Sequence, residues 1–296
     1  MGKYVSLILG QVSLDINVDH TGHAVREVGG AVVASGFAAS ALGHKTCVLP
    51  KANPAEVDPK ALFSRAANVE VIPLVSPRCT SIENVYHTAD KEKRTCRAIS
   101  RIEPYRLHEL PDVDASVVHI AGLMRGDFGG EIIEWASSRA KCALDVQCML
   151  RCAEGPEGIM AFHDWPEKLK YLPLIHFLKT DAAEAEILTG LSDRREAAKV
   201  LHSWGAKEVM ITHNTEAILY DGERFYAEPL VPRNLSGRTG RGDTCFSAYI
   251  TERLTRPIGE ALLTAAALVS LKMETPGPFT GTRADVEVYI RAFYSR

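Results

Sequence analysis

The sequence has little excess charge and lacks the features of a membrane protein or a disulfide-linked protein. Its 296 residues carry 34 basic and 37 acidic side chains, a formal net charge of −3, which argues against a nucleic-acid partner bound by bulk phosphate neutralisation. No apolar run approaches the roughly 20 residues that a membrane-spanning helix needs. The seven cysteines form no CxxC pair, and an odd number is not a disulfide framework. We expect a cytoplasmic protein that binds neither nucleic acid nor membrane.

Two common nucleotide-binding signatures are also missing. The chain contains no GxxxxGK followed by Ser or Thr, so it has no Walker loop. An NAD-linked dehydrogenase would carry GxGxxG directly after its first strand, where this chain has residues 10–15, GQVSLD. The missing GxGxxG motif disfavours the alternative that the protein is a dehydrogenase.

Apolar residues make up 46% of the chain and fall in short runs that alternate between strand-like and helix-like spacing. Such alternation predicts an α/β fold with a mostly parallel sheet covered on both faces. The expected strands are 4–9, 46–49, 69–75, 117–121, 142–146 and 209–212. The expected helices are 30–42, 130–140, 182–189, 195–204, 245–254 and 260–273.

Two segments have the pattern of antiparallel hairpins. Strand-like residues 80–86 and 94–100 flank the polar segment 89–93, and a hairpin inserted in a parallel architecture can serve as a flap over a site. The alternative is an edge hairpin that only extends the sheet. The second hairpin, 217–220 with 225–227, is expected to be of that simpler kind.

The glycine-rich segment 236–245 carries the strongest chemical signal. Three glycines fall within six residues, Gly237, Gly240 and Gly242, and a helix follows at once. Glycines leave backbone N–H groups uncovered, and a helix N-terminus adds unpaired donors and about half a positive charge, so this segment predicts an anion pocket. Asp243 could simply cap the helix. A carboxylate beside an anion pocket could equally be a general base that takes a proton from an attacking hydroxyl.

Three motifs together resemble the ribokinase-like (PfkB) carbohydrate kinases. Thr239–Thr244 resembles the GAGD signature, Gly29-Gly30 resembles the N-terminal diglycine, and Asp181–Glu184 resembles the NxxE segment. The motifs occur in family order along essentially the whole chain. The resemblance implies one domain, 1–296, with a ribokinase-like three-layer α/β/α sandwich, a mostly parallel central sheet and a small β lid from about 11–28 and 76–104.

The resemblance also implies roles for individual positions. Asp243 matches the catalytic base, and Gly240, Arg241 and Gly242 match the anion hole, with Arg241 in place of the usual Ala. Asp15, Gly29 and Gly30 match substrate-binding positions. Glu184 and Asp181 match residues that act on Mg²⁺ through water. Thr212, His213, Asn214, Ala266 and Val269 match the nucleotide side, although the TLG motif at 212–214 loses its Gly.

Departures from the family pattern bear on the substrate. Ala34 stands where many sugar kinases carry Asn, and Gly237 replaces a carboxylate linked to a monovalent cation, so activation by K⁺ is doubtful. The arginine-containing glycine loop, together with segments 80–84, 145–147, 272–273 and 276–278, resembles a narrower branch, the myo-inositol kinases. Glu83, Asn84 and Gln147 are therefore expected to bind acceptor hydroxyls, because a buried hydroxyl left unpaired costs about 1–3 kcal/mol.

We therefore expect an ATP- and Mg²⁺-dependent kinase that phosphorylates a hydroxyl of a cyclic polyol or sugar, with myo-inositol as the best candidate. The alternatives are a kinase for ribose, fructose or a nucleoside, and a sugar-binding protein on the same fold without turnover. Flap hairpins can pair, so a homodimer through the lid is one arrangement that the sequence allows.

Overall fold

The structure, a computed structural model, describes residues 3–88, 93–237 and 239–294. Residues 89–92 of the expected hairpin turn and Arg238 of the glycine loop lie outside the described residues. The strands of the main sheet are β1 (Tyr4–Gln11), β4 (Thr46–Ala52), β5 (Val69–Val71), β6 (Leu74–Val75), β9 (Ala115–Ile120), β10 (Lys141–Asp145), β13 (Phe177–Asp181), β14 (Glu208–Thr212), β15 (Glu216–Tyr220) and β16 (Phe225–Pro229). A second sheet consists of β2 (Ser13–Val18), β3 (Ala24–Gly29), β7 (Ser81–Tyr86), β8 (Arg94–Ser100), β11 (Arg151–Glu154) and β12 (Ile159–Phe162).

Helices connect the strands and cover the main sheet. They are α1 (Ala31–Ala41), α2 (Pro59–Phe63), α3 (Gly130–Arg139), α4 (Gln147–Leu150), α5 (Lys168–Tyr171), α6 (Ala182–Thr189), α7 (Arg194–Ser203), α8 (Arg241–Glu252), α9 (Ile258–Lys272) and α10 (Arg283–Phe293), with 3₁₀ turns η1 (Leu107–Glu109) and η2 (Leu172–Leu174). Within the described ranges, no helix is long and apolar enough to cross a membrane.

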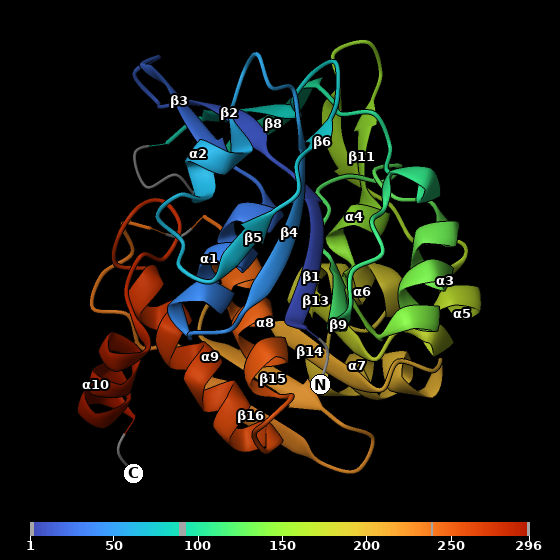
Figure 1. The fold of residues 1–296 in the computed structure, drawn as a ribbon, viewed down its shortest axis with the longest axis vertical. Helices are drawn as coiled ribbons and strands as arrows, with labels where there is room; N and C mark the ends of the chain where they lie inside the picture. Colours follow the sequence, from blue (N-terminus) through green and yellow to red (C-terminus); the bar gives the residue numbers. More distant parts are fainter. Residues whose placement is uncertain (1–2, 89–92, 238, 295–296) are drawn as a thin grey trace.

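The main sheet has the order β16-β15-β14-β13-β10-β9-β1-β4-β5, with β6 also paired to β4 (Figure 1). The pairs from β5 to β14 are parallel, and only the β14–β15 and β15–β16 pairs are antiparallel. Helix-containing crossovers bury both faces of a parallel sheet, so the carboxyl ends of the parallel strands share one edge. In α/β sheets that edge is where ligands bind.

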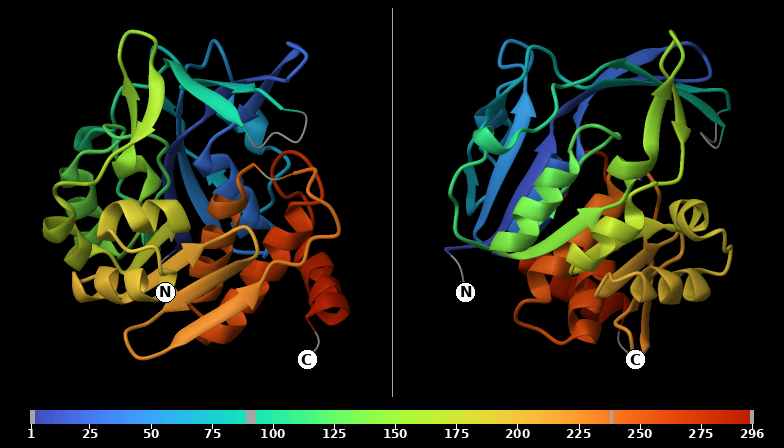
Figure 2. Two further views of the ribbon diagram at one scale, coloured as in Figure 1. Left: turned by 180° about the vertical axis from the view of Figure 1, so that it is seen from behind. Right: turned by 90° about the vertical axis from the view of Figure 1, so that its right-hand side faces the viewer.

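Neighbouring residues of the central strands enter different hydrophobic clusters. Val118, Leu144 and Leu178 belong to the cluster on the side of α3, α6 and α7. The residues before each of them, Val117, Ala143 and Phe177, pack with α8 and α9 on the opposite side. This alternation follows from the two-residue period of a strand and gives three layers, with the sheet between two layers of helices (Figure 2).

The second sheet, the lid, lies beyond the carboxyl ends of the main sheet (Figures 1 and 2). Its order is β11-β12-β8-β7-β2-β3. β1 ends at Gln11 and β2 begins at Ser13, so the chain passes from the main sheet into the lid almost without a connection. Segments 11–28 and 76–104 contain most or all of four of its strands, and the β11–β12 hairpin adds a part that was not predicted from the sequence.

Several details of the main layers differ from the sequence expectations, and strand β13 was not predicted at all. The expected strand 69–75 is two short strands, because Pro73 lacks the N–H that a continuous ladder needs. The expected helix 245–254 begins earlier, at Arg241. Helix α10 was not predicted, although Thr282 and Asp285 form a capping box at its start.

Candidate active site

The glycine loop and the first turn of α8 form the centre of the site. Gly240 is the N-cap of α8 and has φ 74°, a left-handed conformation that favours glycine. Arg241, Gly242 and Asp243 are therefore in the first turn, where backbone N–H groups have no partner inside the helix. Asp243 is not the N-cap, so the capping alternative raised from the sequence is wrong. A half-buried carboxylate beside unpaired donors remains available for chemistry.

The surroundings of Asp243 make it a weaker acid than an ordinary aspartate. Burial raises the pKa of Asp243 to about 6, and the charge of Asp145 adds to the shift. Lys179 and Lys272 act in the opposite direction. A carboxylate with a pKa closer to neutrality is a better proton acceptor at physiological pH than one at about 4.

A buried charge cluster lies behind the loop. Lys179 Nζ is 2.9 Å from Asp145 Oδ2 and 3.9 Å from Glu184 Oε2, and all three side chains are buried. A Cβ added at Gly242 would lie 3.1 Å from Lys179 Nζ, so the ammonium sits directly against the loop. Burial alone would lower the pKa of Lys179, but Asp145, Glu184 and Asp243 hold it above its ordinary value.

Asp181 and Glu184 lock the start of α6. Asp181 Oδ1 accepts from the Glu184 N–H at 2.8 Å, and Glu184 Oε2 accepts from the Asp181 N–H at 2.8 Å. This capping box uses one oxygen of each carboxylate and leaves the other outside it. Among the described residues, no three His, Cys, Asp or Glu side chains gather to hold a metal by themselves. The contact of this pair with Mg²⁺ through water stays a prediction.

Lys272, at the end of α9, binds backbone carbonyl groups of the glycine loop. Its buried ammonium donates to the carbonyl oxygen of Gly237 at 2.5 Å and to that of Thr239. Gly237 lies so close to the helix that a Cβ there would be 1.8 Å from the Thr275 carbonyl oxygen. Burial lowers the pKa of Lys272 to about 8, and Asp243 opposes the shift.

The diglycine and Asp15 bring the lid to the site. A Cβ at Gly29 would lie 3.2 Å from Asp15 Oδ2, and one at Gly30, where φ is 113°, would clash with the Gln11 carbonyl oxygen at 2.3 Å. Close backbone approach thus requires glycine at Gly30, and a side chain at Gly29 would press on Asp15. Burial raises the pKa of Asp15, with Arg151 opposing. Asp15 Oδ1 is buried without a hydrogen-bond partner in the described part of the chain.

The lid separates two residues that were both predicted to bind substrate. Asn84 pairs with Asn17 in register and donates to its side chain at 3.0 Å, so it shares the inner face with Asp15. Glu83, one residue earlier, points to the outer face and is ion-paired with Arg97. The structure therefore does not bring Glu83 together with the other predicted residues, because alternate residues of a strand face opposite sides.

Gln147 lies at the carboxyl end of β10, where α4 begins. Its backbone N–H donates to Asp145 Oδ1 at 3.1 Å, and its side chain is half-buried. Gln147, which was predicted to bind acceptor hydroxyls, thus lies at the same end of β10 as Asp145, the partner of Lys179.

Most of the residues predicted to bind the nucleotide have little solvent-exposed surface. Thr212 is buried at the end of β14, and His213 and Asn214 lie in the turn to β15, with Asn214 exposed. Ala266 and Val269 are fully buried in the cluster formed by α8, α9 and α10. Neither of these two residues presents surface to a ligand in this structure.

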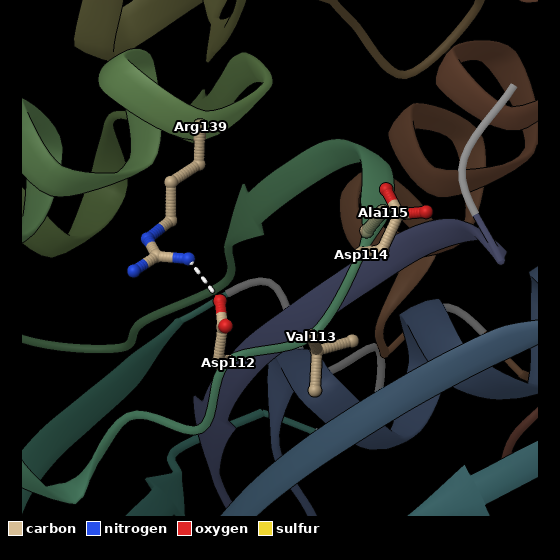
Figure 3. Close-up of a pocket in the computed structure, with 5 residues that line it drawn as sticks. All are labelled: Asp112, Val113, Asp114, Ala115 and Arg139. Atoms are coloured by element: carbon tan, nitrogen blue, oxygen red, sulfur yellow. Dashed lines mark hydrogen bonds and ion pairs between the residues drawn. The ribbon is translucent and has the colours of Figure 1, made fainter.

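Two surface pockets lie at the amino ends of the parallel strands, away from the glycine loop. One is lined by Asp112–Ala115, just before β9, and by Arg139 at the end of α3, which is ion-paired with Asp112 (Figure 3). The second is lined by the start of β10 and by residues that precede β10, β13 and β14. Both pockets are at the amino ends of parallel strands, so neither belongs to the candidate site.

Comparison with known proteins identifies the family. A model of the pfkB family of carbohydrate kinases matches residues 106–284. A cytidine kinase of Thermococcus kodakarensis is 40% identical over 70 residues, which cover 23% of this chain and 25% of that protein. Fructosamine kinase FrlD of Bacillus subtilis is 30% identical over 102 residues, 32% of this chain and 34% of that protein. The chain thus spans only a quarter to a third of the length of these curated relatives.

Solved structures match over nearly the whole chain. A pyrophosphate-dependent kinase in the ribokinase family, complexed with a pyrophosphate analog and myo-inositol, is 36% identical, with a TM-score of 0.86, over 96% of this chain and 99% of its own. A pyrophosphate-dependent myo-inositol-1 kinase converted into a myo-inositol-3 kinase is 35% identical, with a TM-score of 0.86, over 98% of this chain and 100% of its own. Ribokinase of Arabidopsis thaliana, 16% identical with a TM-score of 0.75 over 97% and 99%, shares the fold.

The fold and the matches define an α/β kinase with a β lid, and the chain belongs to the pfkB family of carbohydrate kinases. The family resemblance and the fold predicted from the sequence are confirmed.

The signal that could have revealed Asp145 was present in the sequence, since residues 145–147 resemble the inositol branch. Lys179 gave no such signal, because it interrupts an otherwise apolar strand.

Proposed function

We propose that this protein transfers a phosphoryl group from pyrophosphate to a hydroxyl of myo-inositol or a closely similar cyclic polyol. The observation that carries the proposal is the 36% identity, over 96% of this chain, with a pyrophosphate-dependent kinase complexed with a pyrophosphate analog and myo-inositol. The inositol-branch motifs of the sequence and the polar inner face of the lid support the same acceptor.

Pyrophosphate takes the place of the ATP expected from the sequence. Ala266 and Val269, the residues expected beside an adenine, have no exposed surface. The turn at 212–214 lacks the glycine of the nucleotide motif. Pyrophosphate has no nucleobase, so it needs neither feature. It still needs the cationic groups that lie against the glycine loop, Lys179 and Lys272.

The positions of these groups support the following reaction. An acceptor hydroxyl held by Asp15 and Asn84 gives its proton to Asp243 as its oxygen forms a bond to the nearer phosphorus. The bridging P–O bond of pyrophosphate breaks, and inorganic phosphate leaves with the bridging oxygen. The N–H groups at the start of α8 and the two lysine charges stabilise the negative charge on the transferred group.

Mg²⁺ fits the carboxylate pair at the start of α6. Asp181 and Glu184 would hold it through water, and the ion would supply shielding of the phosphate charges. Burial raises the pKa of Glu184 to about 7, with Lys179 opposing and Asp145 and Asp181 adding to the shift. A nearby cation favours the ionised form of such a carboxylate.

A matrix of donors and acceptors tests the proposal. Purified protein with Mg²⁺ is incubated with pyrophosphate, ATP, GTP or CTP, each with myo-inositol, ribose, fructose or cytidine, and products are followed by ³¹P NMR. We expect an inositol monophosphate and inorganic phosphate from pyrophosphate and myo-inositol. Turnover with ATP but not pyrophosphate would overturn the donor assignment, and turnover only with another acceptor would overturn the assignment of the polyol.

A further inference from the structure

Arg151, the first residue of β11, is a half-buried cation. Its Nε is shielded from solvent and has no hydrogen-bond partner within the described part of the chain. Burial lowers the pKa of Arg151, which records the cost of removing the guanidinium from water. A shielded N–H donor without a partner costs free energy, and proteins usually pair such groups. The missing partner is therefore expected to come from a ligand.

The strand register directs Arg151 to the inner face of the lid. Ile159 of β12 pairs with Arg97 of β8, so it shares the outer face with Arg97 and Glu83. Arg151 pairs with Phe162, three residues after Ile159, and therefore lies on the opposite face. That inner face also carries Asp15 and Asn84, which the proposed function uses for the acceptor.

Arg151 also lies between the lid and the main sheet. It is electrostatically coupled to Asp15 on β2 and to Glu184 at the start of α6, although the three residues belong to distant segments. Its backbone carbonyl accepts from the Arg125 N–H at 2.8 Å, which fixes β11 against the loop after β9. The guanidinium is thus held near the place where the acceptor must meet both the lid and the catalytic loop.

The chemistry of the two charged groups is complementary for a diol. An ionised carboxylate only accepts hydrogen bonds, and a guanidinium only donates them. A hydroxyl does both, so two adjacent hydroxyls can each donate to Asp15 and accept from Arg151. We propose that Arg151 binds the acceptor polyol and, with Asp15, selects for two neighbouring hydroxyls. This inference rests on the proposed function and adds a residue that its motifs do not include.

The test compares Arg151→Met and Arg151→Lys with Arg97→Met. Arg97 is a matched control because it lies in the same lid on the outer face, paired with Glu83. We expect Arg151→Met to raise KM for myo-inositol about ten- to a hundredfold, in line with the loss of charged hydrogen bonds. KM for pyrophosphate should stay within about twofold, and Arg151→Lys should recover only part of the loss because it lacks the planar fork. Arg97→Met should leave both values unchanged.

A second readout separates recognition from structural support. Wild type should prefer myo-inositol over a panel of monodeoxy-inositols, and Arg151→Met should lose that preference for the analogues that lack the bound hydroxyls. Unchanged KM and unchanged discrimination in folded Arg151→Met protein, or a loss confined to kcat, would overturn the inference while the proposed function stands. If Arg151→Met does not fold, Arg151→Lys carries the same comparison. Wild-type protein that phosphorylates no polyol would overturn both.

Discussion

Asp243 and Lys272 are two ionisable side chains on opposite sides of the glycine loop, and their pKa values are displaced in opposite directions. Burial raises the pKa of Asp243 to about 6 and lowers that of Lys272 to about 8. Asp243 must be ionised to accept a proton, and Lys272 must be charged to hold the loop and attract the donor. We therefore predict a bell-shaped dependence of kcat/KM on pH, falling below about 6 and above about 8.

The acid limb of that profile has a specific test. Asp145 raises the pKa of Asp243, and its removal would also free the charge of Lys179, which lowers it. Asp145→Asn should therefore shift the acid limb to lower pH, whatever it does to the maximal rate. The full pH profile is measured for folded protein, with the melting temperature as control. A limb that stays in place or moves upward would contradict the electrostatic account of Asp243.

Lys272 gives a second prediction at the residue scale. Its ammonium binds two loop carbonyls, those of Gly237 and Thr239, beside the position where the sequence lacks the carboxylate linked to a monovalent cation. We predict that K⁺ does not activate the wild-type enzyme, because the carbonyls already have a cation. Lys272→Met should raise KM for pyrophosphate at least tenfold and leave KM for the acceptor nearly unchanged, with partial rescue by ammonium ions.

Exposed Lys199, ion-paired with Glu196 on α7, provides the matched control for that experiment. Lys199→Met should have wild-type kinetics in the same buffers. Strong activation of wild type by K⁺, or an unaltered donor KM in Lys272→Met, would contradict the role given to the buried ammonium.

At the scale of elements, the alternation of β7 separates two neighbouring residues by function. Asn84 lies on the inner face of the lid, and Glu83 lies on the outer face with Arg97. We predict that Asn84→Ala raises KM for the polyol about tenfold, the expected effect of losing one or two hydrogen bonds. Glu83→Ala should change it less than twofold. Steady-state kinetics give KM for the polyol in both variants. A larger rise of this KM in Glu83→Ala than in Asn84→Ala would reverse the assignment of the faces.

The sequence predicted the main layers well where local pattern and tertiary environment agree. Several of the predicted strands are mostly buried, so their sequences are apolar runs that can be recognised; they are β1, β4, β9, β10 and β14. β13 was missed because its buried polar residues, Lys179 and Thr180, break the apolar run that indicates an internal strand. The ammonium of Lys179 is stabilised by Asp145 and Glu184 from other segments, which no local pattern reveals.

The site was predicted unevenly for a similar reason. The glycine loop, the diglycine and the carboxylates of 181–184 carry spacing that depends on backbone conformation, and such spacing is visible in a sequence. Which face of a lid strand turns inward depends on register with β2 and β8, so Glu83 and Asn84 could not be separated. Arg151 was overlooked because its sign, a shielded Nε without a hydrogen-bond partner among the described residues, appears only after folding.

At the scale of the whole molecule, the lid has an outer face that carries exposed apolar side chains. Ile99 on β8 and Val28 on β3 are 53% and 43% exposed. The homodimer through the lid stays a prediction, and this face is the surface that it would use. Ile99→Asp should convert a dimer to a monomer in multi-angle light scattering. A monomeric wild type at micromolar concentration would contradict the prediction.

In the proposed reaction, Asp243 acts as a base on a polyol hydroxyl while the first turn of α8 receives the phosphoryl charge. The most direct measurement is single-turnover formation of inositol monophosphate from pyrophosphate and myo-inositol by wild type and Asp243→Asn, with acceptor binding and melting temperature measured on both. We predict a rate lower by about 10²- to 10⁴-fold in the variant, with acceptor binding retained. A folded Asp243→Asn protein that transfers phosphate at a near wild-type rate would contradict the central claim.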